Sequence, residues 1–428
     1  MIVIYTNEVT NRLKYVFDFV FIDYFGLDIR YETAGIFEPN ENIVAYNRCH
    51  PNALHFEAVD LLFKNDIVSI NPEVIKYKEW IALFPVHGGV FSFDVFAAIF
   101  YLLSRYEEYL PFPKDEHGRF PSSHNLLVKN KMEQQPIVEI WLAFLKEELI
   151  KNNNNLVFKN RSFGFISTID VDHLFAFKGK SIFKNLGGLI KRPKSAIARL
   201  KTIVGIKRDP FDTFDWLNEI HKEQGLKAKL FFLLNNENAL NSQTDSESNV
   251  FLYKIKALKE QQFDFAIHPS YWFTHKENFV NEFKKFKNIF GYSPVEARQH
   301  FLRISFPAYF QKLILLGVKM DYSIGFSDIN GFRSGISVVH PFFDLTTNSI
   351  SSLYLAPFCI ADHVDRFYQK RTAQQIKFEY SQIINNLKKI NGQLITLFHN
   401  DSFGDNRNKI DWVEIFTYLL EQSNKKEQ

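Results

Sequence analysis

The sequence Phe163-Gly-Phe-Ile-Ser-Thr-Ile-Asp170-Val-Asp172-His173 decides the predicted fold. An apolar run of strand length ends in two carboxylates two residues apart, followed by a histidine. On an extended chain Asp170 and Asp172 point to the same side. Carboxylates held together repel each other unless a cation or a shared proton offsets the charge. The pattern is typical of a strand-end turn, or of a metal ligand and a general base held side by side.

Six further apolar runs of strand length follow this one, and helical patterns separate several of them. The runs cover 163–169, 229–234, 263–267, 295–297, 318–320, 353–356 and 393–398. The helical patterns cover 216–223, 252–261, 279–290, 307–316 and 374–390. Alternating strands and helices predict an α/β fold with a parallel sheet, open or closed. Seven strands fit a distorted (β/α)7-type barrel over residues 160–428.

Residues 1–155 have a different pattern and predict a smaller α+β N-terminal domain. A short apolar strand is expected at 2–5, and helices at 13–25, 94–109 and 137–149. The Asn-rich stretch 151–155 is expected to be a linker. Two domains agree with a length of 428 residues.

The composition limits the classes of function. Hydrophobic residues make up 46% and charged residues 23%, a globular balance. A net charge of +3 gives no indication of a nucleic-acid partner. The two cysteines, Cys49 and Cys359, exclude a disulfide framework or a cysteine-based zinc site. Because the sequence shows neither a signal-peptide pattern nor an apolar run of roughly 18 residues, a cytoplasmic location is expected.

Polar residues with catalytic chemistry follow several of the runs. In parallel α/β folds the active site lies at the carboxyl ends of the strands. The residues at these ends are Asp170, His268, Arg298, Asp321 and His399. Imidazole is a good ligand for zinc and similar ions, although a single strand-end histidine is often structural. A histidine that closes the last strand is well placed to donate a proton.

The order of these motifs resembles the polysaccharide deacetylase superfamily, which includes nodulation-type chitooligosaccharide deacetylases. The corresponding stretches are Thr168-Ile-Asp170-Val-Asp172, Ala228-Lys-Leu-Phe-Phe232, His268, Arg298-Gln-His300 and Leu397-Phe-His399, within about 163–414. The N-terminal unit resembles the one that precedes such domains in certain bacterial homologues. That likeness rests on Phe100-Tyr-Leu-Leu-Ser-Arg-Tyr-Glu-Glu-Tyr109 and Asp115…His117-Gly-Arg-Phe120.

The resemblance implies a hydrolase that removes N- or O-linked acetyl groups from a carbohydrate or glycan precursor, with the amide case belonging to the non-peptide carbon–nitrogen hydrolases. It implies a divalent metal, with Zn²⁺ expected, bound by Asp172 and His268. Asp170 would be the general base and His399 the acid that protonates the leaving group. Arg298 would pair with Asp170 and orient it.

Three departures from the family pattern concern the metal. Val171 separates carboxylates that are adjacent in the family, and Trp272 stands where a second ligand histidine is usual. His300 stands where the family's third motif has proline. We therefore expect the third ligand to be His300, with His275 and then His173 as the next choices. A rearranged metal site and a domain that has lost its metal are both compatible with these changes.

Two other functions and one surface contact are also open from the sequence. A glycoside hydrolase on a related barrel would need a second carboxylate, for which Asp321 and Asp362 are the candidates. A non-catalytic glycan-binding relative would explain the missing histidine. The segment 178–208 carries ten Lys or Arg residues. It predicts either a peripheral contact with anionic membrane or glycan, or a solvated cover of the barrel mouth. The sequence does not determine the oligomeric state.

Overall fold

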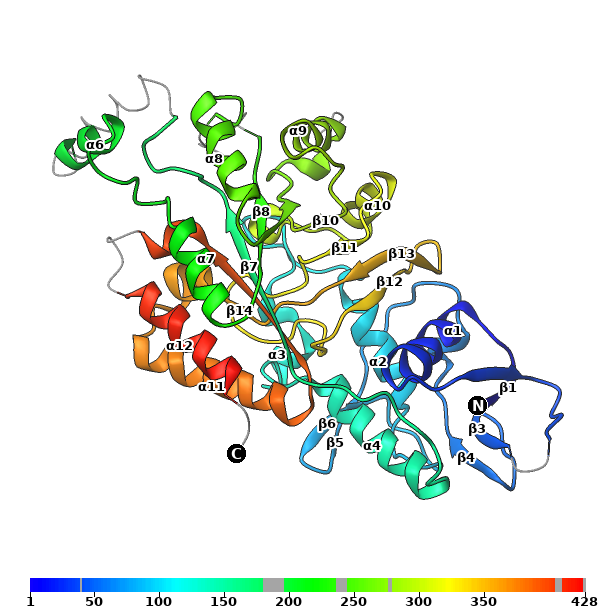
Figure 1. Ribbon diagram of the computed structural model, residues 1–428. Helices are drawn as coiled ribbons and strands as arrows, with labels where there is room; N and C mark the ends of the chain where they lie inside the picture. Colours follow the sequence, from blue (N-terminus) through cyan, green and yellow to red (C-terminus); the bar gives the residue numbers. More distant parts are fainter. Residues whose placement is uncertain (39–40, 180–195, 236–244, 276–278, 405–409, 426–428) are drawn as a thin grey trace.

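The computed structural model describes residues 1–38, 41–179, 196–235, 245–275, 279–404 and 410–425. Within these ranges the larger sheet has nine strands in the order β12-β13-β11-β10-β9-β8-β7-β15-β14 (Figure 1). Their bounds are β7 (Gly164–Val171), β8 (Ala228–Phe232), β9 (Phe263–Ile267), β10 (Glu296–Ala297), β11 (Met320–Asp321), β12 (His340–Asp344), β13 (Ser349–Leu355), β14 (Ile360–Ala361) and β15 (Gln393–His399). All neighbours are parallel except β12 and β13.

The predicted parallel sheet is therefore confirmed, but a closed barrel is not. The strands β12 and β14 lie at the two ends of the order, and no pairing between them is found among the described residues. Each of the seven predicted runs contains or adjoins a strand. The strands β12 and β14 were not predicted from the sequence. The strand β12 contains a proline and a register irregularity, and the strand β14 is only two residues long.

Helices cover the larger sheet at the predicted places. They are α7 (Phe214–Glu223), α8 (Asn249–Lys259), α9 (Val280–Phe290), α10 (Ala308–Leu315) and α11 (Ala373–Lys389). A further helix, α12 (Trp412–Asn424), was not predicted and lies beside α11 (Figure 1). In α11 the buried side chains recur at helical spacing, and Thr372 and Gln375 form a capping box at its start. The apolar face of α11 belongs to the core cluster that includes the centre of the sheet.

The N-terminal unit has a four-stranded sheet in the order β2-β1-β3-β4 and a separate hairpin, β5-β6. The strands are β1 (Ile2–Thr6), β2 (Ile29–Glu32), β3 (Asn42–Tyr46), β4 (Ala53–Phe56), β5 (Val74–Tyr77) and β6 (Trp80–Leu83). All four strands of the sheet are parallel. The prediction of a smaller α+β unit therefore gave its size and its mixture of helices and strands. It did not give the parallel direction of the strands in its sheet.

The helices of this unit differ in length from the predicted ones. The α-helix α1 (Asn11–Phe17) continues as the π-helix η1 (Asp18–Tyr24). The helix α2 (Val95–Leu103) ends before 109 because Arg105 adopts a left-handed φ of 53°. The buried Arg105 side chain then pairs with Glu107 and Glu108. The helix α4 (Ile137–Asn152) runs into the predicted linker.

The two units are joined by a shared hydrophobic cluster and a buried polar network. The hydrophobic cluster of the N-terminal unit includes Ile336 and Phe343 from the C-terminal part of the chain. Glu108 pairs with both Arg105, at 2.8 Å, and Arg333, at 2.6 Å. Breaking a buried ion pair of this kind is strongly destabilising. We therefore expect the two units to depend on each other for stability.

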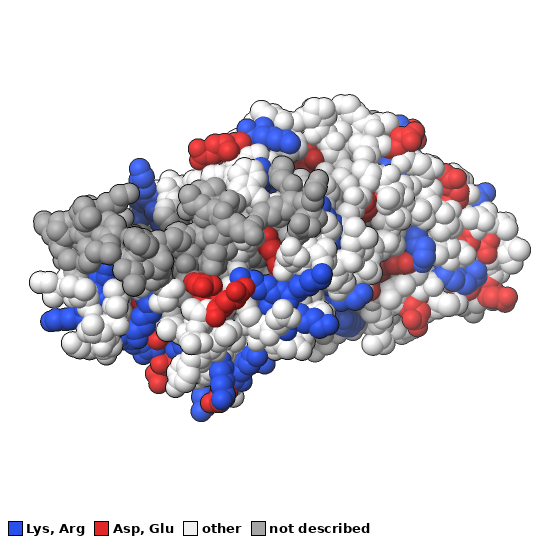
Figure 2. Space-filling view, turned by 90° about the horizontal axis from the view of Figure 1, so that it is seen from above, with Lys and Arg blue, Asp and Glu red and all other residues white. Residues whose placement is uncertain are grey.

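About half of the basic segment 178–208 is outside the described residues, which exclude 180–195. Its described helix α6 (Ala196–Ile203) exposes Ile197 and Leu200. On the face shown in Figure 2, basic and acidic side chains are both present. No helix in the described part of the chain is long and apolar enough to cross a bilayer.

Candidate metal centre and catalytic groups

The carboxyl ends of β7, β9 and β15 meet at one cavity of about 280 Å³. The register of β7 and β15 places His399 opposite Asp170, and β9 delivers His268 at its end. The predicted residues that line the cavity are Asp170, Asp172, His173, His268, His300 and His399. The structure therefore brings together side chains that lie up to 229 positions apart in the sequence (399 − 170).

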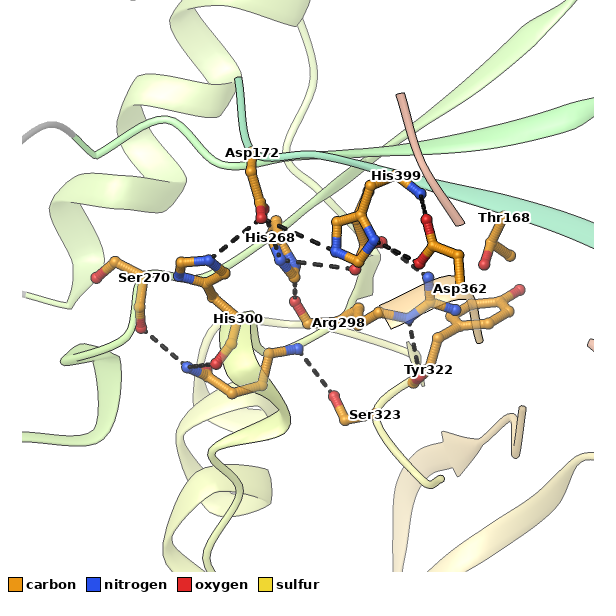
Figure 3. Close-up of polar contacts among 12 residues, drawn as sticks. Thr168, Asp172, His268, Ser270, Arg298, His300, Tyr322, Ser323, Asp362 and His399 are labelled. Atoms are coloured by element: carbon orange, nitrogen blue, oxygen red, sulfur yellow. Dashed lines mark hydrogen bonds and ion pairs between the residues drawn. The ribbon is translucent and has the colours of Figure 1, made fainter. Parts of the chain in front are cut away.

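Asp172, His268 and His300 form the group best suited to a metal ion. One ligand atom of each residue lies within 4.8 Å of the others. His268 Nε2 is 3.3 Å from Asp172 Oδ1, and His300 Nε2 is 3.5 Å from Asp172 Oδ2 (Figure 3). Bonds of about 2.0–2.2 Å around a tetrahedral cation place neighbouring ligand atoms roughly 3.3–3.6 Å apart. Each imidazole nitrogen therefore lies at a ligand-to-ligand spacing from one oxygen of the Asp172 carboxylate.

The hydrogen bonds around His268 and Asp172 support the same conclusion. His268 Nδ1 lies 2.5 Å from the carbonyl oxygen of Arg298. Donation from Nδ1 leaves the Nε2 lone pair facing Asp172, the arrangement usual for a metal-binding histidine. Asp172 Oδ1 is buried and has no hydrogen-bond partner among the described atoms, and a cation would satisfy it. The nitrogen and oxygen donors fit Zn²⁺ and other divalent ions, and they do not select among them.

The charge state of Asp172 also fits a ligand. Burial alone would raise the pKa of this carboxyl, but the imidazole groups of His300, His268 and His399 beside it outweigh burial. The net effect holds the pKa of Asp172 well below its ordinary value. Asp172 is therefore ionised at neutral pH, as a metal ligand must be.

Among the three candidates for the third ligand, only His300 belongs to this group. His173 lines the cavity but is outside the group. The side chain of His275 lies outside the described residues. His300 precedes a turn in which Phe301 and Leu302 have φ values of 59° and 51°. This left-handed turn, rather than a regular strand or helix, aims His300 at Asp172.

Asp170 is held by a buried arginine, as expected from the resemblance. Arg298 Nη1 donates to Asp170 Oδ1 at 2.8 Å, and Arg298 Nε donates to the carbonyl oxygen of Tyr322 at 3.0 Å. The guanidinium lies 4.5 Å from the centre of the Phe231 ring. Arg298 has no exposed surface and Asp170 is 2% exposed. Asp170 Oδ2 remains 3.6 Å from His268 Nε2, beside the metal group.

On the strand next to Asp170, His399 forms a pair with Asp362. Asp362 Oδ1 is 2.7 Å from His399 Nδ1, and Asp362 Oδ2 accepts from the His399 backbone N–H at 2.8 Å. Burial would lower the pKa of His399, but Asp362 outweighs it and raises that pKa to about 10. Burial would raise the pKa of Asp362, but His399 lowers it to about 2. The imidazole is therefore a cation at neutral pH, with Nε2 3.9 Å from Asp172 Oδ2.

His363 completes a second group with Asp362 and His399 whose ligand atoms also lie within 4.8 Å of one another. Both oxygens of Asp362 already accept hydrogen bonds from His399, and Ser402 Oγ donates to one of them. Burial, followed by the charge of His399, lowers the pKa of His363 to about 4. We therefore interpret this group as a proton-holding pair beside a neutral histidine, rather than as a metal site.

Two residues at the site were not assigned to these positions from the sequence. Asp362 was considered only as a glycosidase carboxylate, although it follows the short apolar stretch 358–361 and so also stands at a strand end. Arg119 lines the cavity from the N-terminal unit. The stretch 115–120 was noted in the sequence, but no local pattern shows that it reaches a cavity in the other unit.

Comparisons with known proteins find one family model that matches the N-terminal unit and solved structures that are only distantly similar to the chain. No curated protein matches the sequence. The model of a family of unknown function, DUF7033, matches residues 2–154. The chain is similar to a candidate polysaccharide deacetylase from Mycobacterium smegmatis, at 12% identity and a TM-score of 0.41, over 62% of this chain and 85% of that one.

Two further solved structures show a comparable likeness. The PuuE allantoinase has 9% identity and a TM-score of 0.40, over 63% of this chain and 86% of that one. A 4-alpha-glucanotransferase from Thermococcus litoralis has 13% identity and a TM-score of 0.34, over 62% of this chain and 38% of that one. All of these TM-scores are below 0.5. The assignment of chemistry therefore rests on the geometry of the site.

Proposed function

We propose that the protein is a metal-dependent hydrolase that removes N- or O-linked acetyl groups from a carbohydrate or glycan precursor. One observation carries the proposal: a metal-ligand group shares one cavity with a carboxylate held by Arg298 and an imidazolium held by Asp362. Hydrolysis of an amide or ester needs a base for the attacking water and an acid for the leaving group. Both are present at one cavity, beside the ligands.

The residues of the chain divide this chemistry among themselves. A divalent cation held by Asp172, His268 and His300 would supply a water of lowered pKa and positive charge beside the acetyl carbonyl. Asp170 Oδ2, the oxygen that Arg298 leaves unengaged, accepts a proton from the attacking water. His399 carries a proton at neutral pH and delivers it to the leaving amine or alkoxide.

The two carboxylates predicted for the glycoside hydrolase alternative do not face the cavity. Neither Asp321 nor Asp362 lines the cavity. Asp321 is fully buried and accepts hydrogen bonds from Tyr309 and Ser323. Asp362 is engaged by His399. Cleavage of a glycosidic bond needs a second carboxylate facing the sugar, and these two residues do not provide one.

Acetate release from a panel of N-acetylated and O-acetylated sugars tests the proposed function and separates the two linkages. The Asp170→Asn and His399→Asn variants should each lose at least about 100-fold in kcat, which is the usual contribution of a positioned acid or base. Asp264→Asn is the matched control, since Asp264 lies on β9 but is half-exposed and pairs with Lys227 at the surface. A wild type that binds the glycan without turnover would instead support the non-catalytic alternative.

Metal analysis is the second test of the same proposal. Purified protein should retain close to one divalent ion per chain, and His268→Ala should release it. Zn²⁺ as the ion, a cytoplasmic location, and contact of 178–208 with anionic membrane or glycan remain part of the proposal. Reconstitution with single metals would test the identity of the ion, and binding to anionic vesicles would test the contact of 178–208 with a membrane.

A further inference from the structure

The turn 115–119 of the N-terminal unit lies against the cavity, and Arg119 forms part of the cavity wall. Asp115 builds this turn, because its Oδ1 accepts from the backbone N–H groups of His117 and Arg119 at 2.9 and 2.8 Å. Its Oδ2 lies 2.7 Å from Arg119 Nε. Gly118 supplies the positive φ of 77° that the turn requires. The direction of the Arg119 side chain is thus fixed within its own turn.

Two reciprocal hydrogen bonds join this turn to the residues directly after His300. Arg119 Nη1 donates to the carbonyl oxygen of Phe301 at 2.9 Å. In the other direction, Arg303 Nε donates to the carbonyl oxygen of His117 at 2.9 Å. The His117 ring also packs against Phe301, with ring centres 5.0 Å apart. Because both donors are guanidinium groups, these hydrogen bonds are charge-assisted and among the stronger ones.

The segment that receives these bonds has a strained backbone. Phe301 and Leu302 are two successive non-glycine residues in the left-handed region, at φ 59° and 51°. Such conformations persist only where the surroundings fix them, and they cluster at functional sites. Arg119 binds the carbonyl of the first strained residue, which follows His300 without an intervening residue. Release of this turn would therefore move His300.

We infer that the N-terminal unit completes the active site, because its 115–119 turn holds the 301–303 turn in the conformation that aims His300 at the metal. The inference rests on the proposed function in taking His300 as a ligand. Arg119 is a positioning residue, since it acts through Phe301 and not on the reacting atoms. This role gives the region matched by the family of unknown function a direct part in the chemistry of the C-terminal unit.

The Arg119→Ala variant tests the inference with two readouts besides activity. In chelator-treated protein, amide hydrogen exchange in a peptide covering 299–304 should become at least about ten-fold faster. The affinity for Zn²⁺, measured by competition with a chromophoric chelator, should fall about 10- to 100-fold, as it does when supports of a metal ligand are removed. Arg119→Lys keeps one donor and should restore part of both effects.

Arg12→Ala is the matched control. Like Arg119, Arg12 is a buried arginine that joins the two units, because its Nε donates to Asn348 Oδ1 at 2.9 Å. Its Nη1 donates to the carbonyl oxygen of Leu61, in its own unit, at 3.1 Å. Arg12 is not among the residues that line the cavity. Its loss should lower the melting temperature and leave both the exchange of 299–304 and the Zn²⁺ affinity unchanged.

The outcomes separate this inference from the proposed function. Unchanged exchange in 299–304 would overturn the holding role of Arg119. Faster exchange with unchanged Zn²⁺ affinity would overturn the claim that this turn places His300. If the wild type binds no divalent ion while Arg119→Ala exchanges faster, the holding role stands and the proposed function fails. Should Arg119→Ala not fold, the same comparisons are made with Arg119→Lys.

Discussion

Replacement of Asp362 by Asn tests the pair that holds the proton on His399. Asp362 is fully buried, and its Oδ1 is 2.7 Å from His399 Nδ1. Burial alone would lower the pKa of His399, but Asp362 raises it to about 10. In the unfolded chain the same imidazole has an ordinary pKa of about 6.5. The Asp362→Asn variant keeps the shape of the side chain and removes the charge.

The sign and size of the effect follow from these two pKa values. Because the folded-state pKa of His399 is the higher one, its stabilising contribution is complete below about pH 6.5 and is lost as the pH rises through about 10. The interval between about 6.5 and about 10 corresponds to on the order of 4–5 kcal/mol, at about 1.4 kcal/mol per pH unit. The Asp362→Asn variant removes the largest of the charges that raise this pKa, while Asp172 and Asp170 remain. The difference in unfolding free energy between wild type and variant should therefore shrink by up to about 1.4 kcal/mol per pH unit from about pH 7 upward.

Urea denaturation of chelator-treated protein at pH 6.5, 8 and 9.5 measures this difference. The control is Asp365→Asn, because Asp365 is also buried but pairs with Arg371, at 2.6 Å. An arginine stays protonated throughout this range, so the control should lose stability by an amount that does not change with pH. A wild-type-minus-variant difference for Asp362→Asn that stays constant from pH 6.5 to 9.5 would refute the reasoning.

Three further predictions concern stability and metal. Burial raises the pKa of Glu139 to about 7, above its ordinary 4.5. The unfolding free energy of wild type should therefore fall by up to about 3 kcal/mol between about pH 4.5 and 7, and that of Glu139→Gln should not show this fall. Urea denaturation at pH 5 and 8 checks this. Arg298→Met leaves Asp170 buried without its partner and should cost about 3–5 kcal/mol in unfolding free energy, measured by the same titration. Removal of metal by chelation should lower the melting temperature, because a free metal concentration of 100 Kd stabilises by about 2.7 kcal/mol; calorimetry should find no such effect in His268→Ala.

Much of the site could be predicted because parallel strands bring their carboxyl ends to one edge of a sheet. Each strand is marked by a local apolar run, so the residue after each run is a candidate. This rule found Asp170, His268, Arg298 and His399, and the structure places all four together around the cavity or beneath it. The rule would also have given Asp362 its place, had the two-residue strand before it been recognised.

Other features could not be predicted, because they depend on contacts between distant parts of the chain. The choice of His300 over His173 follows from a left-handed turn at Phe301, which no local sequence preference indicates. The early end of α2 follows from the burial of Arg105 against Glu108. Closure of the sheet was predicted from the number of strands, but strand number alone does not determine whether the end strands pair.

The sequence by itself determined the alternation of strands and helices and the chemical types that stand at the strand ends, because both follow from local hydrophobic periodicity. Only the tertiary structure decided which of these groups share a site, what charge they carry and what holds them. Arg119 binds the backbone beside His300 across 182 positions of sequence, and Asp362 sets the charge of His399 by proximity and burial. Hydrogen bonding and desolvation depend on distance in space, and the linear sequence does not contain that distance.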